Sequence, residues 1–218
     1  MSDLLSTQTL LALSFVGSLV GTAFVLSRTQ LREGTSSKSK NIFVWLAFDC
    51  LCHLTLEGSF LYLSTFGRTI NASNGFFATL WKDYARADAR WGFSDPTVVS
   101  LEILTVLGAG PLAGYCAYLI SVDDPIYHFW VVVLSVAELY GGFMTFAPEW
   151  LTGNKFLNGS DFLLMWVYLF FMNMAWVVIP FYLIYDSYVV IAANVARQGS
   201  LYAVAAAPAS KSRSKKRS

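Results

Sequence analysis

The chain has 218 residues, of which 56% are hydrophobic and 13% are charged, and its net charge is +1. Soluble domains carry about 25% charged residues, so this composition argues against a soluble protein and indicates a membrane protein. No nucleic-acid signature is present. The three cysteines are too few for a disulfide framework, and nothing near them suggests a set of metal ligands.

Five apolar stretches approach or exceed the length that a membrane helix needs. A helix that crosses the hydrocarbon layer takes about 20 mostly apolar residues. The stretches run near 9–27, 42–66, 97–120, 126–147 and 161–187. They are continuously apolar rather than alternating, which favours helices over a β-barrel. The predicted fold is therefore all-α, a polytopic bundle of five transmembrane helices around an intramembrane polar cavity.

The chain divides into three predicted segments. Residues 1–41 hold the first transmembrane helix and a basic cytosolic loop, and residues 42–187 hold a core of four helices. Residues 188–218 form a basic cytosolic tail that we expect to be disordered. The first apolar stretch lacks a positively charged leader and is long, so we read it as a retained span rather than a signal peptide.

Charge asymmetry predicts the orientation in the membrane. With a lumenal N-terminus and a cytosolic C-terminus, ten of the 15 Lys and Arg residues fall on the cytosolic side. The glycosylation sequons at Asn71 and Asn158 then both face the lumen. The last four residues, 215–218, look like a dilysine retrieval signal for the endoplasmic reticulum. A basic tail resting on anionic lipid explains them equally well.

The second span contains three ionisable residues at a regular interval. Asp49, His53 and Glu57 are spaced four and four, so they form a column on one face of a helix. Each charge at bilayer depth costs about 2.5–3.5 kcal/mol, and such residues face a protein interior or a cavity. The three could simply pair with one another to fix packing, but three in one span favour a functional role.

The later spans add polar residues of the same kind. These are Glu102 and Thr105 in the third span, Glu138 in the fourth, and Asn173 and Trp176 in the fifth. Taken alone, Asn173 could simply hydrogen-bond to a neighbouring helix, and Trp176 could be an ordinary packing residue. If all these faces converge, they form a pocket in which at least one carboxyl group is protonated near neutral pH. Such a pocket suits a cationic ligand or a carbocation that arrives from the lipid.

Two glycine patterns bear on helix contacts. Pro111, within GAGPLAG, removes a backbone hydrogen bond and should interrupt the third helix, and its glycine neighbours allow a second helix to approach closely. In the first span, Gly17 and Gly21 form a GxxxG pattern. With the resemblance described next, this pattern makes a homodimer a possible assembly.

Several motifs, in order and at matching spacing, resemble the emopamil-binding protein family with its EXPERA-type membrane domain. They are CHLTLEG, LWKDYARADARW, SLEILT, ELYG and MNMAW followed by IP, and the resemblance covers about residues 42–187. It implies a five-span protein of the endoplasmic reticulum membrane. The isomerase branch moves a sterol double bond from the 8(9) to the 7(8) position without a cofactor. Protonation at C9 gives a cation at C8, and loss of a C7 proton completes the shift.

The resemblance also implies which residues act. The expected catalytic residues are His53, Glu57, Glu102, Asn173 and Trp176. The expected substrate-binding residues are Thr105, Asp49, Asp88, Arg90 and Glu138. On this reading Glu57, bonded to His53, delivers the proton, and Glu102 stabilises the cation or acts as the base. No metal is expected.

Other features resemble the emopamil-binding protein-like paralogue branch, which is thought not to isomerise sterols. They include ADARW, FLYLS and MTFAPEWL, and Glu138 stands where isomerases carry Gln. Three functions therefore stay open. A sterol isomerase is the first, and a non-catalytic protein that binds sterols or cationic amphiphiles is the second. A proton-coupled transporter is the third, because acidic columns also build proton relays.

Overall fold

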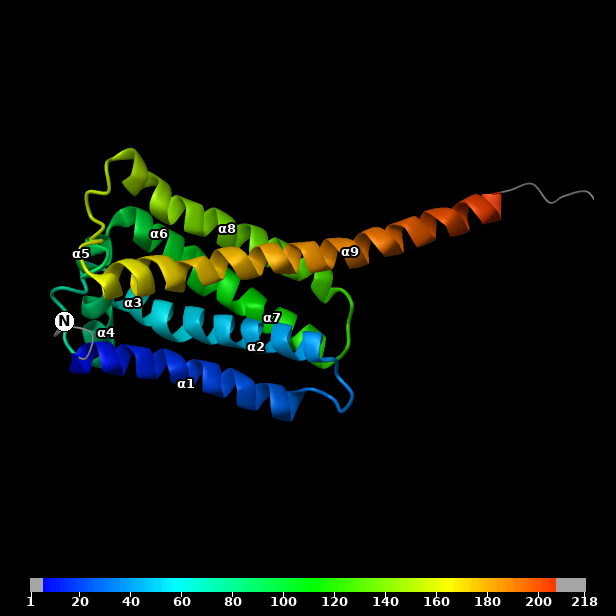
Figure 1. The fold of residues 1–218 in the computed structure, drawn as a ribbon, viewed down its shortest axis with the longest axis horizontal. Helices are drawn as coiled ribbons and strands as arrows, with labels where there is room; N and C mark the ends of the chain where they lie inside the picture. Colours follow the sequence, from blue (N-terminus) through cyan, green and yellow to red (C-terminus); the bar gives the residue numbers. More distant parts are fainter. Residues whose placement is uncertain (1–5, 207–218) are drawn as a thin grey trace, which may run out of the picture.

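The computed structural model describes the backbone of residues 6–206 and the side chains of residues 6–201. Within that range all regular structure is helical, apart from one antiparallel bridge between Asp88 and Leu157. The helices are α1 (Thr7–Gln30), α2 (Ser37–Leu51), α3 (Gly58–Leu63), α4 (Phe76–Tyr84), α5 (Ala89–Phe93), α6 (Pro96–Leu104), α7 (Gly110–Ser121), α8 (Tyr127–Leu151) and α9 (Met172–Ala206), shown in Figure 1. Three π-helical segments join them: η2 (Cys52–Glu57), η3 (Thr105–Ala109) and η4 (Leu163–Phe171).

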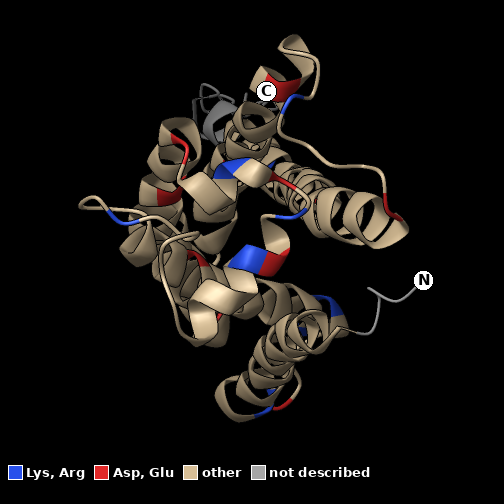
Figure 2. Cartoon of the chain, turned by 90° about the vertical axis from the view of Figure 1, so that its left-hand side faces the viewer, with Lys and Arg blue, Asp and Glu red and all other residues tan. Residues whose placement is uncertain are grey.

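These elements combine into five helices that are long and apolar enough to cross a membrane. They are Thr7–Gln30, Ser37–Leu63, Pro96–Ser121, Tyr127–Leu151 and Leu163–Leu201. Most of the ribbon in the end-on view of Figure 2 is free of charged residues. Exposed apolar side chains such as Val25, Leu107 and Phe171 lie on the outward faces of the helices. The predicted all-α bundle of five spans is confirmed.

The last helix is longer than the sequence predicts. α9 continues to Ala206 and extends well beyond the other helices (Figure 1). The predicted disorder is therefore wrong for residues 188–206. The stretch YVVIAANVA contains neither Pro nor Gly and is rich in apolar residues, so nothing in it ends the helix. The basic residues 211–217 lie outside the described residues.

One apolar core lies toward the end of the bundle that carries the loop between α1 and α2. α2 packs against both α1 and α7, and α8 packs along α9. Leu46, Leu134 and Leu183, from three different helices, are almost fully buried in this core. In the second span, its members are residues 42, 43, 46 and 47, which precede the acidic column.

A second core, made largely of aromatic rings, closes the opposite end. The rings of Trp81 and Trp91 stack with centroids 4.8 Å apart, and Phe60 packs on Trp91 at 4.6 Å. Trp81 Nε1 also donates to the carbonyl of Leu56 at 3.1 Å, which ties this core to η2. Since Phe60 follows the column in sequence, the ionisable residues lie in a polar layer between two apolar cores.

The π-helical segments were not predicted, and each one lies next to candidate site residues. η2 contains His53 and Glu57, η3 begins at Thr105, and η4 ends two residues before Asn173. Such widened turns are rare and often occur at functional sites. η3 ends directly before the Gly110–Pro111 pair, where the sequence predicts an interruption of the third span.

The glycines of α1 face away from the protein. A Cβ added to Gly17 or Gly21 would have no protein atom within 4 Å. This surface is therefore free for lipid or for another helix, and the homodimer stays a prediction.

Candidate active site

The three ionisable residues of the second span do lie in one column. His53 Nδ1 is hydrogen-bonded to Glu57 Oε2, and His53 Nε2 lies 3.1 Å from Asp49 Oδ1. The side chains of Asp49 and His53 are buried, whereas that of Glu57 is 19% exposed. The imidazole therefore links one carboxyl group sealed inside the bundle to another that reaches its edge.

Glu102 meets the Glu57 end of this column, as predicted. α6 begins at Asp95–Pro96, where the Asp95 side chain accepts a hydrogen bond of 2.8 Å from a backbone N–H of the first turn. Glu102 lies two turns later and is buried, and its carboxyl group is close enough to that of Glu57 for the two to interact. Thr105 Oγ1 donates to Glu102 Oε2 at 2.9 Å. An ionised carboxylate only accepts, so two carboxyl groups can bond to each other only when one carries a proton.

Glycines allow the third span to approach the column. A Cβ on Gly110 would lie 2.8 Å from the Cβ of His53, and one on Gly114 would lie 3.0 Å from Cys50 Sγ. A larger residue at either position would force the two spans apart. The predicted close approach of the helices at GAGPLAG is confirmed.

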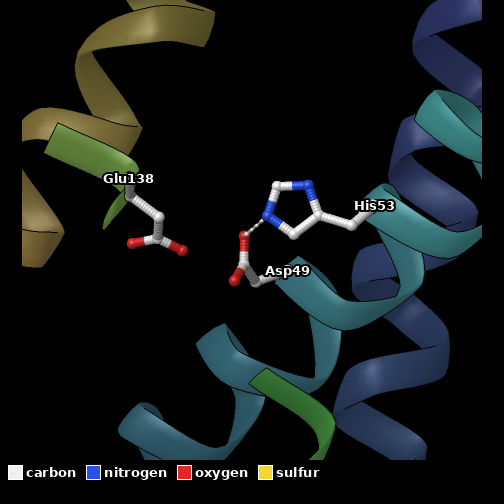
Figure 3. A group of neighbouring side chains, drawn as sticks. All are labelled: Asp49, His53 and Glu138. Atoms are coloured by element: carbon white, nitrogen blue, oxygen red, sulfur yellow. Dashed lines mark ion pairs between the residues drawn. The ribbon is translucent and has the colours of Figure 1, made fainter. Parts of the chain in front are cut away.

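Glu138 of α8 lies at the other end of the column. Figure 3 shows its carboxyl group directed toward Asp49 and His53. Glu138 is 7% exposed, and neither of its carboxyl oxygens has a hydrogen-bond donor among the described residues. The column thus has a pair of carboxyl groups at each end, Glu57 with Glu102 and Asp49 with Glu138.

Trp176 reaches the column through its ring nitrogen. Trp176 Nε1 donates to Asp49 Oδ1 at 2.7 Å. The ring also packs against Trp45, with centroids 5.2 Å apart, and against Phe48 at 5.9 Å. In this arrangement, Trp176 orients Asp49.

Asn173 makes a different set of contacts. Its Nδ2 donates to the carbonyls of Tyr168 and Leu169 in η4, at 2.9 and 3.0 Å, and to Tyr84 Oη at 3.3 Å. The amide therefore satisfies carbonyls that the π-helical turn leaves free, and none of these contacts reaches the carboxyl groups. Tyr84 was not singled out from the sequence. Burial raises the pKa of its phenol, so it stays a neutral hydrogen-bonding group beside Asn173.

Asp88 and Arg90 form a buried ion pair near the aromatic end of the bundle. Arg90 Nε and Nη2 donate to the two Asp88 oxygens at 2.9 and 2.6 Å, and Glu149 Oε1 lies 3.7 Å from Arg90 Nε. Burial lowers the pKa of Arg90, but the hydrogen bonds and charge of Asp88 raise it further, so the guanidinium keeps its charge. Glu149 Oε2 in turn accepts from the backbone N–H of Phe156 at 2.8 Å. These contacts hold the segment around Asp88 and Arg90 against the segment from Glu149 to Phe156. Substrate binding by Asp88 and Arg90 stays a prediction.

Two shallow hollows on the described residues have volumes of about 400 Å³ each, and no column residue lines either of them, so neither is the predicted cavity. One lies between α6 and α8, where Leu101, Leu104 and Tyr140 form part of its wall. Glu102 follows Leu101 in sequence, but its own side chain is buried and does not line this hollow.

The sequence of the chain is similar to those of known proteins. Residues 76–187 match the family model described as EXPERA, the expanded EBP superfamily. The chain is 29% identical over 171 residues to 3-beta-hydroxysteroid-Delta(8),Delta(7)-isomerase of Cavia porcellus, covering 78% of this chain and 73% of the relative. It is 27% identical over 187 residues to the Mus musculus protein of the same name, covering 85% and 80%.

Other relatives carry different names. Isomeliandiol synthase MOI2 of Melia azedarach is 25% identical over 150 residues, covering 69% of this chain and 68% of the relative. The family match extends over half of the chain and includes Glu102, Glu138, Asn173 and Trp176. This protein therefore belongs to the EXPERA family, the expanded EBP superfamily.

Proposed function

We propose that this protein is an intramembrane sterol isomerase that moves the 8(9) double bond to the 7(8) position in sterol biosynthesis. The observation that carries the proposal is the Glu57–Glu102 pair, in which two spans bring carboxyl groups close together inside an apolar bundle. His53 and Thr105 each hold one of these groups in place. The names of the Cavia porcellus and Mus musculus relatives support the same reaction.

The two carboxyl groups can carry out both proton transfers. Glu57 donates a proton to C9, and the electrons of the 8(9) double bond form the new C–H bond, which leaves the cation at C8. Glu102 stabilises that cation and accepts the proton that C7 loses, so that the C–H electrons form the 7(8) double bond. The contact between the two groups then returns the proton to Glu57, and no cofactor is consumed. Each positioned acid or base typically contributes about 10²–10⁴-fold to such a reaction.

The substrate arrives from the bilayer in this proposal. Glu57 is the member of the column that reaches the bundle edge, and the hollow between α6 and α8 is lined partly by leucines. A sterol entering there places its apolar rings against the leucines and its double bond near the carboxyl pair. The proposal also takes the membrane to be that of the endoplasmic reticulum, with the N-terminus in the lumen.

Sterol profiling in cells that lack sterol isomerase tests the activity. Expression of the wild-type chain should convert accumulated 8-ene sterols to 7-ene sterols. Glu57→Gln and Glu102→Gln each remove one proton-transfer group and should lower conversion at least 100-fold. Glu33→Gln, in an exposed loop, is the matched control and should convert like wild type. No conversion by a wild-type chain that is present in the membrane would refute the proposal.

A non-catalytic binding protein for sterols or cationic amphiphiles is the second candidate. The pair Asp49–Glu138 favours it, because two acidic groups in addition to Glu57 and Glu102 attract a positively charged amine whether or not a reaction follows. Tight binding of an amphiphilic amine together with an unchanged sterol profile would decide for this function. Conversion of the 8-ene sterols would decide for the isomerase.

A further inference from the structure

Four buried polar atoms without a hydrogen-bond partner gather at one point of the bundle. Among the described residues, nine buried side-chain nitrogen and oxygen atoms have no such partner. Four of them belong to three neighbouring residues: Asp49 Oδ2, His53 Nε2 and both carboxyl oxygens of Glu138. His53 Nε2 lies 3.1 Å from Asp49 Oδ1 without making a hydrogen bond. Buried polar atoms are normally satisfied, so a cluster of exceptions calls for a missing partner.

We propose that Asp49, His53 and Glu138 bind a divalent transition-metal ion such as Zn²⁺. One potential ligand atom from each residue lies within 4.8 Å of the others, and all three residues are buried. Ligand atoms of a tetrahedral zinc site are about 3.4 Å apart, given bonds of about 2.0–2.2 Å to nitrogen and carboxylate oxygen. Figure 3 shows the Glu138 side chain facing the other two, and binding a metal would require it to move toward them.

The surroundings of these residues match those of known metal sites. A histidine that binds a metal through one ring nitrogen usually donates the other N–H to a carboxylate, which fixes its orientation. Here Glu57 accepts that hydrogen bond from His53 Nδ1, so Nε2 is left to the metal. The carboxyl group of Asp49 is held in the same way, by the indole N–H of Trp176 at 2.7 Å. Asp49 Oδ2 and His53 Nε2 stay without a hydrogen-bond partner.

Charge neutralisation supports the same conclusion. Asp49 and Glu138 lie inside the membrane, and no Lys or Arg forms an ion pair with either of them among the described residues. The ion pair of Asp49 with His53 compensates at most one negative charge, so the two carboxylates together remain costly at this depth. A divalent cation neutralises both and satisfies the atoms that lack partners. The competing arrangement is a proton shared between the two carboxyl groups, which leaves His53 Nε2 unsatisfied.

The site has three protein ligands and an open fourth position, the arrangement of zinc sites that also bind water or a substrate. It differs from the cofactor-free expectation for the family and uses Glu138, which lies in the fourth span. The inference does not depend on the proposed isomerase activity. The metal would bind through Nε2, whereas the proton-transfer pair contacts the imidazole through Nδ1.

Direct metal binding tests the proposal. The full-length protein, purified in detergent and stripped with a chelator, is titrated with Zn²⁺ by calorimetry and then analysed for bound metal. We expect one Zn²⁺ for each chain. Glu138→Gln should abolish this binding, and Glu57→Gln should weaken it about 10–100-fold because it replaces the charged acceptor of the His53 N–H by a neutral amide oxygen. Glu33→Gln is the control and should bind like wild type.

Zinc-edge X-ray absorption of the loaded wild-type protein identifies the ligands without any variant. Coordination by nitrogen and oxygen alone, with imidazole scattering, would support the site. This measurement tests the proposal even if the Glu138→Gln variant does not fold. Sulfur ligands would point instead to Cys50, Cys52 or Cys116 and would overturn the proposal. Absence of stoichiometric binding by wild type, or equal binding by a folded Glu138→Gln variant, would overturn it as well.

Discussion

Replacing Arg90 by Met tests whether the Asp88–Arg90–Glu149 cluster has a structural role. Arg90 and its two acidic partners are each no more than 4% exposed, and Arg90 makes two short hydrogen bonds to Asp88. Removing the only cation of this cluster leaves two buried carboxylates without a partner, at a cost of about 3–5 kcal/mol. In a chain of this size each kcal/mol shifts the unfolding midpoint by about 2–4 °C, so Arg90→Met should lower it by about 6–20 °C.

The assay is thermal unfolding in detergent, followed by tryptophan fluorescence at one fixed heating rate, since membrane proteins often unfold irreversibly. Arg32→Met provides the control. Arg32 also forms an ion pair, with Asp123 at 2.8 Å, but the two side chains are 63% and 59% exposed. Such surface pairs contribute at most about 1 kcal/mol, so this variant should lose no more than about 4 °C. Equal midpoints for the two variants would refute a structural role for the cluster and leave substrate binding as its explanation.

Two further predictions concern helix packing. Gly110→Ala places a Cβ 2.8 Å from that of His53, so it should displace the column, lower isomerisation and reduce stability by about 1–3 kcal/mol. Gly108→Ala, which has no atom within 4 Å of its added Cβ, should leave both unchanged; activity equal to wild type in both variants would contradict the close approach. Tyr168→Phe removes the 2.5 Å hydrogen bond to Asp83 that joins η4 to α4, and should cost about 1.5–3 kcal/mol by thermal unfolding. The exposed Tyr62→Phe is its control, and a loss of equal size there would show that the buried bond adds nothing.

The sequence predicts those parts of the site that follow from spacing within one helix. Residues four apart share a face, which is why Asp49, His53 and Glu57 were expected to form the column that the structure confirms. The expected meeting of Glu102 with Glu57 needed a further assumption, that apolar spans turn their ionisable groups inward. The five spans were predictable for the same reason, because length and apolar composition are local properties.

Contacts that depend on the packing of separate helices were not predictable in this way. No local pattern shows that Glu138 faces Asp49 rather than lipid, because this depends on the rotation of α8 in the bundle. The π-helical turns were also missed, although they determine that Asn173 bonds to carbonyls of η4 rather than to the column. Glu149 is separated from Arg90 by 58 residues of chain, and only the folded loops bring the two together.

The most direct test of the central claim is deuterium incorporation into the sterol product. The claim is that Glu57 and Glu102 together give a proton to C9 and take one from C7. Glu57 is 19% exposed, so its proton should exchange with solvent between turnovers. When the full-length protein acts on an 8-ene sterol in D₂O, the 7-ene product of the wild-type chain should therefore carry deuterium at C9. Glu57→Gln and Glu102→Gln should form no labelled product. A labelled product that both variants form at the wild-type rate would contradict the account.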